Sequence, residues 1–301
     1  MLDGLLVVDK PAGWTSHDVV ARLRRVVGQK RVGHAGTLDP DATGVLLVGL
    51  GRVTRLLQFL QTQSKAYDAT VVFGVATDTL DAAGTVVSSE PMEVTAEQVA
   101  AAAVTFVGDI EQVPPMVSAV KIGGRRLHEL AREGKEVERP PRPVTIYRLE
   151  VENVDPGPPP TATITVECSS GTYIRTLASD LGAALGGPAH LGVLRRTRVG
   201  DYTLADATPL EVVESDPEAV LRTPAQAVGH LRRVRVGSAG ARHVEVGRPL
   251  TPGDWSEESS VPGETARGGE VAVVDDTGEL LAVYEPDGDT LRPTVVVAAA
   301  S

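Results

Sequence analysis

The amino-acid sequence predicts an α+β protein with a mixed, mostly antiparallel sheet flanked by helices, followed by a small β domain. Its 301 residues, 42% hydrophobic and 23% charged, are enough to bury a sizeable core. Helical and strand patterns do not alternate regularly, as a doubly wound parallel sheet would require. Beyond about residue 231 the pattern changes to short strands and turns. We therefore expect two domains, over residues 1–230 and 231–301.

The first expected elements are a buried strand and an amphipathic helix. Residues 5–8 are all apolar and lead into a Lys-Pro-Ala-Gly turn. Ser16 is a suitable N-cap for a helix that ends before Gly28. The apolar side of this helix would carry Val19, Val20, Leu23, Val26 and Val27.

The middle of the chain predicts three strands and two helices. Residues 65–73 alternate like a strand, and Thr95 can cap a helix that ends near residue 104. Residues 144–154 and 161–168 predict two strands joined by a proline-rich turn. Residues 173–185 place apolar side chains at helical spacing and predict a helix.

The last part of the chain predicts a short connection and then the small β domain. Residues 213–228 are expected to form the connection, with one short helix. Residues 275–278, Asp-Asp-Thr-Gly, are typical of a hairpin turn. The expected strands of this domain cover residues 234–236, 271–274, 280–284 and 294–297. About 70 residues is close to the lower limit for an independent core.

Charge is distributed unevenly along the chain. The net charge is −11, but residues 250–301 carry eleven acidic residues against two arginines, a net of −9. The rest of the chain carries only −2 and contains local basic clusters, which suit contact with phosphates. Alternatively, these arginines lie on solvent-exposed helix surfaces and bind no phosphate. The clusters lie at residues 22–31, 121–132, 195–198 and 232–235.

Several classes of site are disfavoured by the sequence. Cys168 is the only cysteine, and the six histidines show no ligand spacing, so we expect neither a disulfide framework nor a metal. Residues 49–54 lack the Gly-Lys-Ser/Thr ending of a phosphate loop and are expected to be a turn. The first residues do not suit a signal peptide, and no apolar run is long enough to span a membrane. A cytoplasmic protein is expected.

Residues 33–44 form the most informative segment, with three glycines, a histidine and two carboxylates leading into an apolar run. A polar loop anchored on a core element is a common way to hold catalytic groups. Pro40 biases Asp39 toward an extended backbone and so presets its carboxylate. Asp41 is the rival carboxylate, expected to act in a turn or as a cap.

Five blocks, in order along about residues 4–210, make the chain resemble the TruB-type tRNA pseudouridine synthases. They are residues 9–16, 33–44, 112–121, 171–175 and 194–197, and the short segment 65–67 fits the same family. The resemblance implies a pseudouridine-synthase catalytic domain that converts uridine 55 in the T-arm loop of tRNA without a cofactor. It also implies a cytoplasmic monomer with no obligatory protein partner. A PUA-like β domain is expected at residues 231–301, although its acidic sequence cannot be matched residue by residue.

The resemblance assigns catalytic roles to three residues. Asp39 would be the nucleophile and Arg175 its ion-pair partner, and Tyr67 would stack on the flipped uracil with its hydroxyl placed for proton transfer. Attack at C6, attack at C1′ and a glycal-like path all remain open. The alternatives from the residues alone are a structural Asp–Arg pair and an ordinary strand tyrosine.

The resemblance also implies a set of residues that contact the RNA. His34 would fill the gap left by the flipped base, and Lys10 would support the active-site loop. The basic segment at about residues 121–142 would close on the T-arm. The full set is Lys10, His34, Tyr173, Ile174, Leu194, Lys121, Arg125 and Arg126.

Two other functions fit the same residues. One is an RNA chaperone that opens the T-loop and refolds tRNA independently of catalysis. The other is a guide-RNA-dependent synthase, which is disfavoured because the chain carries its own expected T-arm segment.

Overall fold

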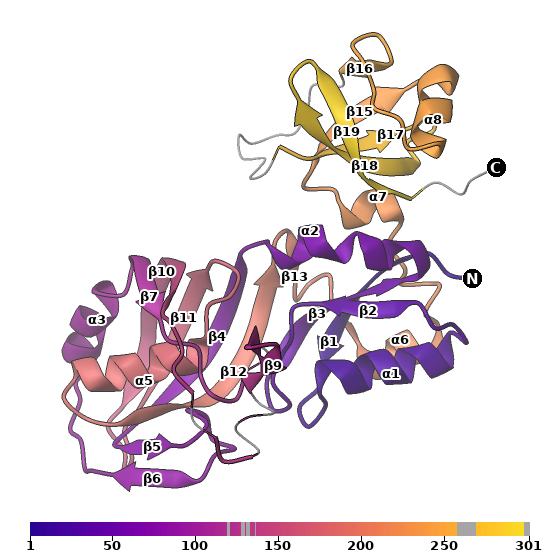
Figure 1. Ribbon diagram of the computed structural model, residues 1–301. Coiled ribbons are helices and arrows are strands. Elements are labelled where there is room, and N and C mark those ends of the chain that lie inside the picture. Colours follow the sequence, from indigo (N-terminus) through magenta and orange to yellow (C-terminus); the bar gives the residue numbers. More distant parts are fainter. Residues whose placement is uncertain (119–120, 128–129, 131–132, 136, 258–268, 298–301) are drawn as a thin grey trace.

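The computed structural model describes residues 1–301 except 119–120, 128–129, 131–132, 136, 258–268 and 298–301. A large body formed by most of the chain carries a smaller β domain at one end (Figure 1). The body is built on a ten-stranded sheet with the order β14-β1-β3-β12-β4-β11-β10-β7, to which β2 and β13 add at β3 and β12. Its strands are β1 (Gly4–Lys10), β2 (Val32–Ala35), β3 (Thr43–Leu50), β4 (Lys65–Phe73), β7 (Gly108–Gln112), β10 (Arg142–Asp155), β11 (Thr161–Cys168), β12 (Ala189–Val199), β13 (Tyr202–Thr203) and β14 (Thr208–Pro209).

The sheet is mixed and mostly antiparallel, which confirms the predicted fold class. Only the β1–β14 and β3–β12 pairs are parallel. The β3–β12 pair joins the two halves of the sheet, with Arg195 beside Thr43 and Arg196 beside Gly44. Gly44 has a φ of +100°, and a Cβ there would lie 2.2 Å from the Arg196 carbonyl oxygen. This seam therefore requires a glycine.

Helices cover parts of the sheet and its edges (Figure 1). They are α1 (Ser16–Val26), η1 (Gly51–Arg55), α2 (Leu57–Gln61), α3 (Ala96–Val104), α5 (Ile174–Ala184), α6 (Leu210–Ser215) and α7 (Pro224–Ala227). The expected turn at residues 49–54 is the end of β3 followed by the 3₁₀ helix η1. Two short helices, α6 and α7, replace the single one expected at residues 213–228.

The cap of helix α1 differs from the prediction by one residue. Thr15, not Ser16, is the N-cap, and it forms a capping box in which Asp18 accepts from the Thr15 backbone. Thr95 caps α3 as predicted, again through a capping box. Ser16 is therefore released for a contact with the 33–44 loop.

Two of the clusters of buried side chains lie entirely within the body. One packs α3 and α5 against β4, β11 and β12, with Val71, Phe73, Ile164 and Leu177 fully buried. The other packs α1 against β1 and β3. The pocket described below opens above the first cluster, beside the first turn of α5.

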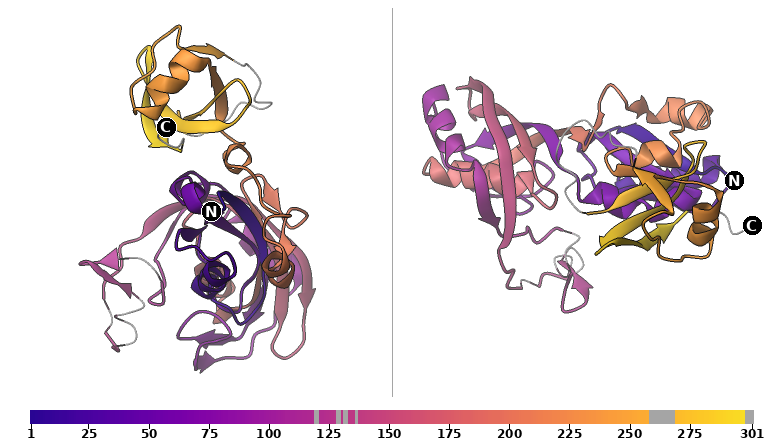
Figure 2. Two further views of the ribbon diagram at one scale, coloured as in Figure 1. Left: turned by 90° about the vertical axis from the view of Figure 1, so that its right-hand side faces the viewer. Right: turned by 90° about the horizontal axis from the view of Figure 1, so that it is seen from above.

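Two small hairpins extend from the body. One is β5 (Val75–Thr77) with β6 (Val86–Ser89), and the other is β8 (Lys121–Ile122) with β9 (Arg125–Arg126). Figure 2 shows the β8–β9 hairpin standing away from the main sheet.

The small domain contains a five-stranded sheet with the order β16-β15-β17-β18-β19 and one helix, α8 (Ser238–Glu245). The expected turn at residues 275–278 joins β17 to β18, and the Asp275 carboxylate accepts from the backbone N–H groups of Thr277 and Glu279. The strands are β15 (Arg232–Val236), β16 (Trp255–Glu257), β17 (Val271–Val274), β18 (Leu280–Asp287) and β19 (Thr290–Val296).

The small domain is fastened to the body by apolar packing and two arginines. One buried cluster combines Leu5 and Phe59 of the body with Leu280 and Val283 of the small domain. Arg52 donates to the Val297 carbonyl oxygen at 2.9 Å, and Arg55 donates to that of Val296 at 2.6 Å. In the described part of the chain, no helix combines the length and apolarity needed to cross a bilayer.

Candidate active site

The loop that carries Asp39 is held from beneath by the buried ammonium group of Lys10. Its Nζ donates to the carbonyl oxygens of Pro11 (2.9 Å), Trp14 (2.6 Å) and Pro40 (2.9 Å). Burial lowers the pKa of Lys10 to about 8, with opposing contributions from nearby carboxylates. Lys10 was expected among the RNA contacts and as a support of this loop. Because its side chain is fully buried, the structure places it under the loop and away from the surface.

Ser16 holds the same loop from the side. Its Oγ accepts a hydrogen bond from the Leu38 N–H (2.9 Å) and donates one to the Leu38 carbonyl oxygen (3.2 Å). The backbone immediately before Asp39 is therefore fixed to the start of α1.

Arg175, in the first turn of α5, contacts the Asp39 carboxylate, as the resemblance to the TruB-type synthases implies. Its Nε lies 3.2 Å from Asp39 Oδ2, and only 6% of the Arg175 side chain is exposed. Its Nη2 donates to the Val117 carbonyl oxygen (2.8 Å) and its Nη1 to that of Thr79 (3.2 Å). These bonds fix the guanidinium in one orientation.

A second carboxylate, that of Asp81, shares the same guanidinium. Its Oδ2 lies 3.0 Å from Arg175 Nη1, and its Oδ1 accepts from the Thr79 hydroxyl at 2.6 Å. The preceding Leu80 has a φ of +62°, an unfavourable value for a residue with a side chain. The sequence analysis missed Asp81. The only sequence signal is a polar Thr-Asp-Thr-Leu-Asp run beyond β5.

The electrostatic balance at Asp39 combines burial with two opposing charges. Burial raises the pKa of the Asp39 carboxyl, Arg175 lowers it, and Asp81 raises it again. This holds although 42% of the Asp39 side chain is accessible, because the surrounding loop and sheet exclude much of the water around it. Arg175 therefore favours the ionised form of Asp39, but the pKa of this carboxyl still lies above its usual value.

Asp39 lines a pocket of about 290 Å³ together with Tyr67, Tyr173, Ile174 and Arg175. Leu194 of β12 also lines this pocket. Six of the predicted site residues therefore meet in one place, although they come from four distant parts of the sequence. The pocket has an apolar wall and a charged floor, as ligand sites commonly do.

Arg196 is a buried cation of this site that the sequence analysis placed in a basic surface cluster. It is 1% exposed. Its Nε donates to the Val45 carbonyl oxygen (2.7 Å) and its Nη2 to that of Gly36 (3.1 Å), on either side of Asp39 in the chain. Burial raises the pKa of the Tyr67 hydroxyl, and the neighbouring Arg196 guanidinium opposes this rise. Arg196 thus connects the loop to Tyr67.

The neighbours of Arg196 do not form the expected basic patch either. Arg195 pairs with Asp9 at 2.7 Å, and Arg198 pairs with Glu167 at 2.5 Å. In the cluster at residues 195–198, Arg196 is therefore buried, and the other two arginines are half-buried and paired with carboxylates.

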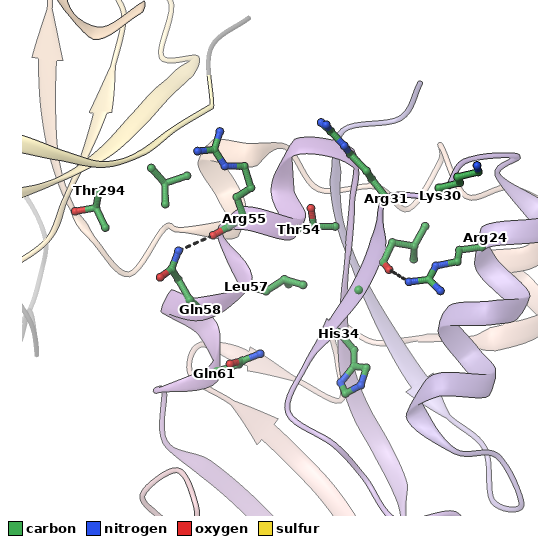
Figure 3. A pocket seen from close by; sticks show the side chains of 13 residues that line it. Arg24, Lys30, Arg31, His34, Thr54, Arg55, Leu57, Gln58, Gln61 and Thr294 are labelled. Carbon is green, nitrogen blue, oxygen red and sulfur yellow. Dashed lines mark hydrogen bonds between the residues drawn. The ribbon is translucent and has the colours of Figure 1, made fainter. Parts of the chain in front are cut away.

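His34 lies on β2, outside the pocket that holds Asp39, in an adjoining groove (Figure 3). Its ring packs edge-to-face on that of His17, with centroids 5.2 Å apart. Burial lowers the pKa of His34 to about 4, helped by the charges of His17 and Arg196. The imidazole is therefore neutral near pH 7.

The predicted T-arm segment is described only in part. Arg125, on the β8–β9 hairpin, forms an ion pair with Glu133, which also pairs with Lys135 at 2.9 Å. The side chains of Lys121 and Arg126 lie outside what the structure describes.

Among the described residues, no group of three or more His, Cys, Asp or Glu side chains is arranged to hold a metal ion.

Comparisons with known proteins match most of this chain to one family. Residues 24–174 match the model described as "TruB family pseudouridylate synthase (N terminal domain)". Residues 175–225 match that of the "tRNA pseudouridylate synthase B C-terminal domain". The second match ends before β15, so neither model covers the small β domain.

Curated relatives and solved structures agree with this match. A protein of Arthrobacter sp. named tRNA pseudouridine synthase B is 44% identical, covering 99% of this chain and 97% of its own. One of the same name from Symbiobacterium thermophilum is 54% identical over 80% of this chain and 81% of its own. A crystal structure of a Cbf5–Nop10–Gar1 complex superposes with a TM-score of 0.76 at 26% identity, covering 99% of this chain and 85% of that one.

Proposed function

Since the chain belongs to the TruB family of pseudouridylate synthases, we propose that it isomerises uridine to pseudouridine at position 55, in the T-arm loop of tRNA. The observation that carries this proposal is the Asp39 carboxylate, held by Arg175 at 3.2 Å in a pocket that also contains Tyr67. The names of the relatives support tRNA as the substrate.

Asp39 is the nucleophile in this proposal. During the isomerisation the N1–C1′ bond breaks, the uracil turns, and a C5–C1′ bond forms. The proton on C5 leaves and N1 gains one, so no atom is added and no cofactor is needed. An ionised carboxylate of raised basicity suits attack on the nucleotide. Whether it attacks C6 or C1′, or follows a glycal-like path, does not alter this balance.

Tyr67 and Arg175 prepare the pocket for the base. The guanidinium of Arg175 is itself held by hydrogen bonds to Thr79, Asp81 and Val117. It therefore holds the Asp39 carboxylate in one orientation, so little rearrangement precedes the attack. Tyr67 offers its ring to the uracil and its hydroxyl for proton transfer. Ile174 and Leu194 supply the apolar walls, which exclude water from the reacting bonds.

His34 takes part in opening the RNA in this proposal. A uridine stacked inside a folded loop must leave its stack before it can reach Asp39. A neutral imidazole carries no charge that must be desolvated when it enters the RNA loop. The low pKa of His34 therefore suits a side chain that replaces the flipped base.

The direct test is Asp39→Asn, which keeps the shape of the side chain and removes the nucleophile. We expect single-turnover pseudouridine formation on a T-arm stem-loop to fall by at least ~10⁴-fold. Binding of the stem-loop should persist, because phosphate contacts dominate affinity. The measurement is mapping of pseudouridine in tRNA incubated with each protein.

Asp41→Asn is the matched control, because Asp41 is the exposed carboxylate on the same loop. Full activity of Asp39→Asn would exclude the proposed nucleophile. Modification by the wild-type protein at other uridines but not at position 55 would exclude the proposed substrate position.

A further inference from the structure

The side chain of Gln112, at the end of β7, is buried against the start of α5. It is 1% exposed and does not line the pocket that holds Asp39. Its Oε1 accepts a hydrogen bond from the Tyr173 N–H (2.9 Å), and its Nε2 donates one to the Tyr173 carbonyl oxygen (3.3 Å). A single amide group therefore pairs with both main-chain groups of one residue, as a neighbouring strand would do.

This pairing fixes the point at which α5 begins. Tyr173 is the N-cap of α5, and its own side chain forms no capping hydrogen bond. Its carbonyl oxygen also accepts from the Leu177 N–H at 3.1 Å, as the carbonyl of an N-cap residue does at the start of a helix. Helix ends fray unless their main-chain groups are held. The Gln112 amide therefore determines where the first turn of α5 lies.

Two groups of the candidate active site depend on that first turn. Tyr173 lines the Asp39 pocket directly. Arg175 follows in the same turn, and its Nε lies 3.2 Å from Asp39 Oδ2. Reacting groups have to be held within about 0.5 Å of their productive geometry. A small shift at the start of α5 would therefore disturb both the guanidinium and the pocket wall.

The strand that carries Gln112 also begins the 113–141 segment, which leaves β7 and returns at β10. Gln112 is the register partner of Arg142, where β10 begins. Further along the segment, the Val117 carbonyl oxygen accepts from Arg175 Nη2 at 2.8 Å. The start of this segment therefore contacts α5 at two points, the main chain of Tyr173 and the guanidinium of Arg175.

We propose that Gln112 is a positioning residue of the reaction, which holds the start of α5 so that Arg175 faces Asp39 and Tyr173 faces the base. This inference rests on the proposed function for the reaction that it serves. A buried amide is costly to displace when both of its hydrogen-bonding groups are in use, because each would be left unsatisfied. Gln112 acts through Tyr173 and Arg175, since it lies outside the pocket itself.

The test is Gln112→Met, which keeps the length of the side chain and removes both hydrogen bonds. With the protein in excess over a T-arm stem-loop, the single-turnover rate of pseudouridine formation should fall by about 10- to 100-fold, because a misplacement of about 1 Å can cost that much. The dissociation constant of the stem-loop should stay within about twofold of the wild type, because phosphate contacts dominate affinity.

The pH profile separates a loss of orientation from a loss of stability. Arg175 lowers the pKa of the Asp39 carboxyl, so that pKa should rise when the guanidinium is displaced. Activity requires the ionised carboxylate, so the acidic limb of the rate profile should move to higher pH. The other charges that act on Asp39, those of Asp81, Lys10 and Asp41, are unchanged by the substitution. A loss of stability alone would lower the amount of active protein without moving the limb.

Gln29→Met is the matched control. Gln29 is 9% exposed, exchanges the same pair of hydrogen bonds with the main chain of Leu2, both at 2.9 Å, and does not line the pocket. It should lose a comparable part of its stability in urea, yet keep the wild-type rate and acidic limb. A wild-type rate in Gln112→Met, an acidic limb that stays in place, or an equal loss of rate in the control would each overturn the proposal.

Gln112→Glu serves as a second variant if Gln112→Met does not fold. An ionised carboxylate there can accept from the Tyr173 N–H but sets an oxygen against the Tyr173 carbonyl. When protonated, it donates to that carbonyl as the amide does. Between about pH 5 and pH 9, a range that includes the raised pKa of a buried carboxyl, its rate relative to the wild type should fall as the carboxyl ionises. A ratio that stays constant over this range would overturn the proposal.

A failure of the proposed function would give a different result. If the wild-type protein forms no pseudouridine, the proposed reaction fails, but the pKa of Asp39 can still be followed by NMR titration of its isotope-labelled carboxyl carbon. A higher pKa in Gln112→Met than in the wild type would support the positioning role, and an unchanged pKa would overturn it. If the wild type is active and Gln112→Met matches it, only the role of Gln112 fails.

Discussion

At the scale of single residues, the unusual feature is one arginine shared by two carboxylates. Arg175 lies 3.2 Å from Asp39 and 3.0 Å from Asp81. A guanidinium paired with a single carboxylate would stabilise that anion fully and make it a weaker nucleophile. Because Asp81 takes part of the interaction, Asp39 stays oriented yet remains basic. In the proposed reaction, Asp81 acts through Arg175 as a positioning residue.

Asp81→Asn should therefore change both the rate and its pH dependence. Without the negative charge of Asp81, which raises the pKa of Asp39, that pKa should fall. Activity requires the ionised carboxylate, so the acidic limb of the kcat/KM profile should move to lower pH. At neutral pH kcat should fall by about 10- to 100-fold, because Arg175 loses a partner that orients it.

The measurement is a pH profile of single-turnover pseudouridine formation for Asp81→Asn and the wild type. Asp41→Asn removes a smaller contribution of the same sign to the pKa of Asp39, so it should move the acidic limb in the same direction by less. A loss of stability alone would reduce the amount of active protein without moving the limb. An acidic limb that stays in place, or moves to higher pH, would contradict the charge-sharing argument.

At the scale of elements, the sequence patterns locate most strands and helices but not their pairing. The strand Lys65–Phe73 and the strand Thr161–Cys168 have the predicted bounds, because alternation is a local property. The insertion of β12 between β3 and β4 is not local, so the burial of Arg196 could not be predicted. Asp81 was missed for the same reason, since only tertiary packing brings it to Arg175.

The close approach of β3 and β12 predicts that Gly44 cannot be replaced by a residue with a side chain without a loss of stability. Gly44→Ala would place its Cβ 2.2 Å from the Arg196 carbonyl oxygen, on a backbone with φ of +100°. The clash and the strained backbone together should lower the free energy of unfolding by about 3 kcal/mol or more. Urea unfolding followed by circular dichroism measures this loss.

Gly186→Ala separates the two contributions to that loss. Gly186 also has a positive φ, +83°, but a Cβ there would meet no atom within 4 Å. It should cost only the backbone strain, about 1 kcal/mol. Equal losses for the two variants would show that close approach to Arg196 is not the cause.

At the scale of the whole molecule, the two domains are joined by a shared core. Leu280 and Val283 of the small domain lie in one buried cluster with Leu5 and Phe59 of the body. A β domain of this size is close to the lower limit for independent stability. Its acidic composition adds repulsion within it. The small domain should therefore depend on the body for its stability.

This dependence predicts that the two domains unfold in a single transition. The chain has two tryptophans, and they lie in different domains: Trp14 packs on the α1 cluster of the body, and Trp255 packs on the core of the small domain. Trp14→Phe leaves a fluorescence probe of the small domain alone, and Trp255→Phe leaves one of the body. The joining cluster must open before either part is exposed. For each variant, the urea midpoint followed by fluorescence should therefore equal the midpoint followed by circular dichroism, and the midpoints of the two variants should coincide.

Val283→Ala weakens the joining cluster and costs about 1–3 kcal/mol. It should shift both midpoints together or separate them with the small domain unfolding first. A small domain that unfolds at higher urea than the body would show that it is independently stable and that the shared core does not govern it.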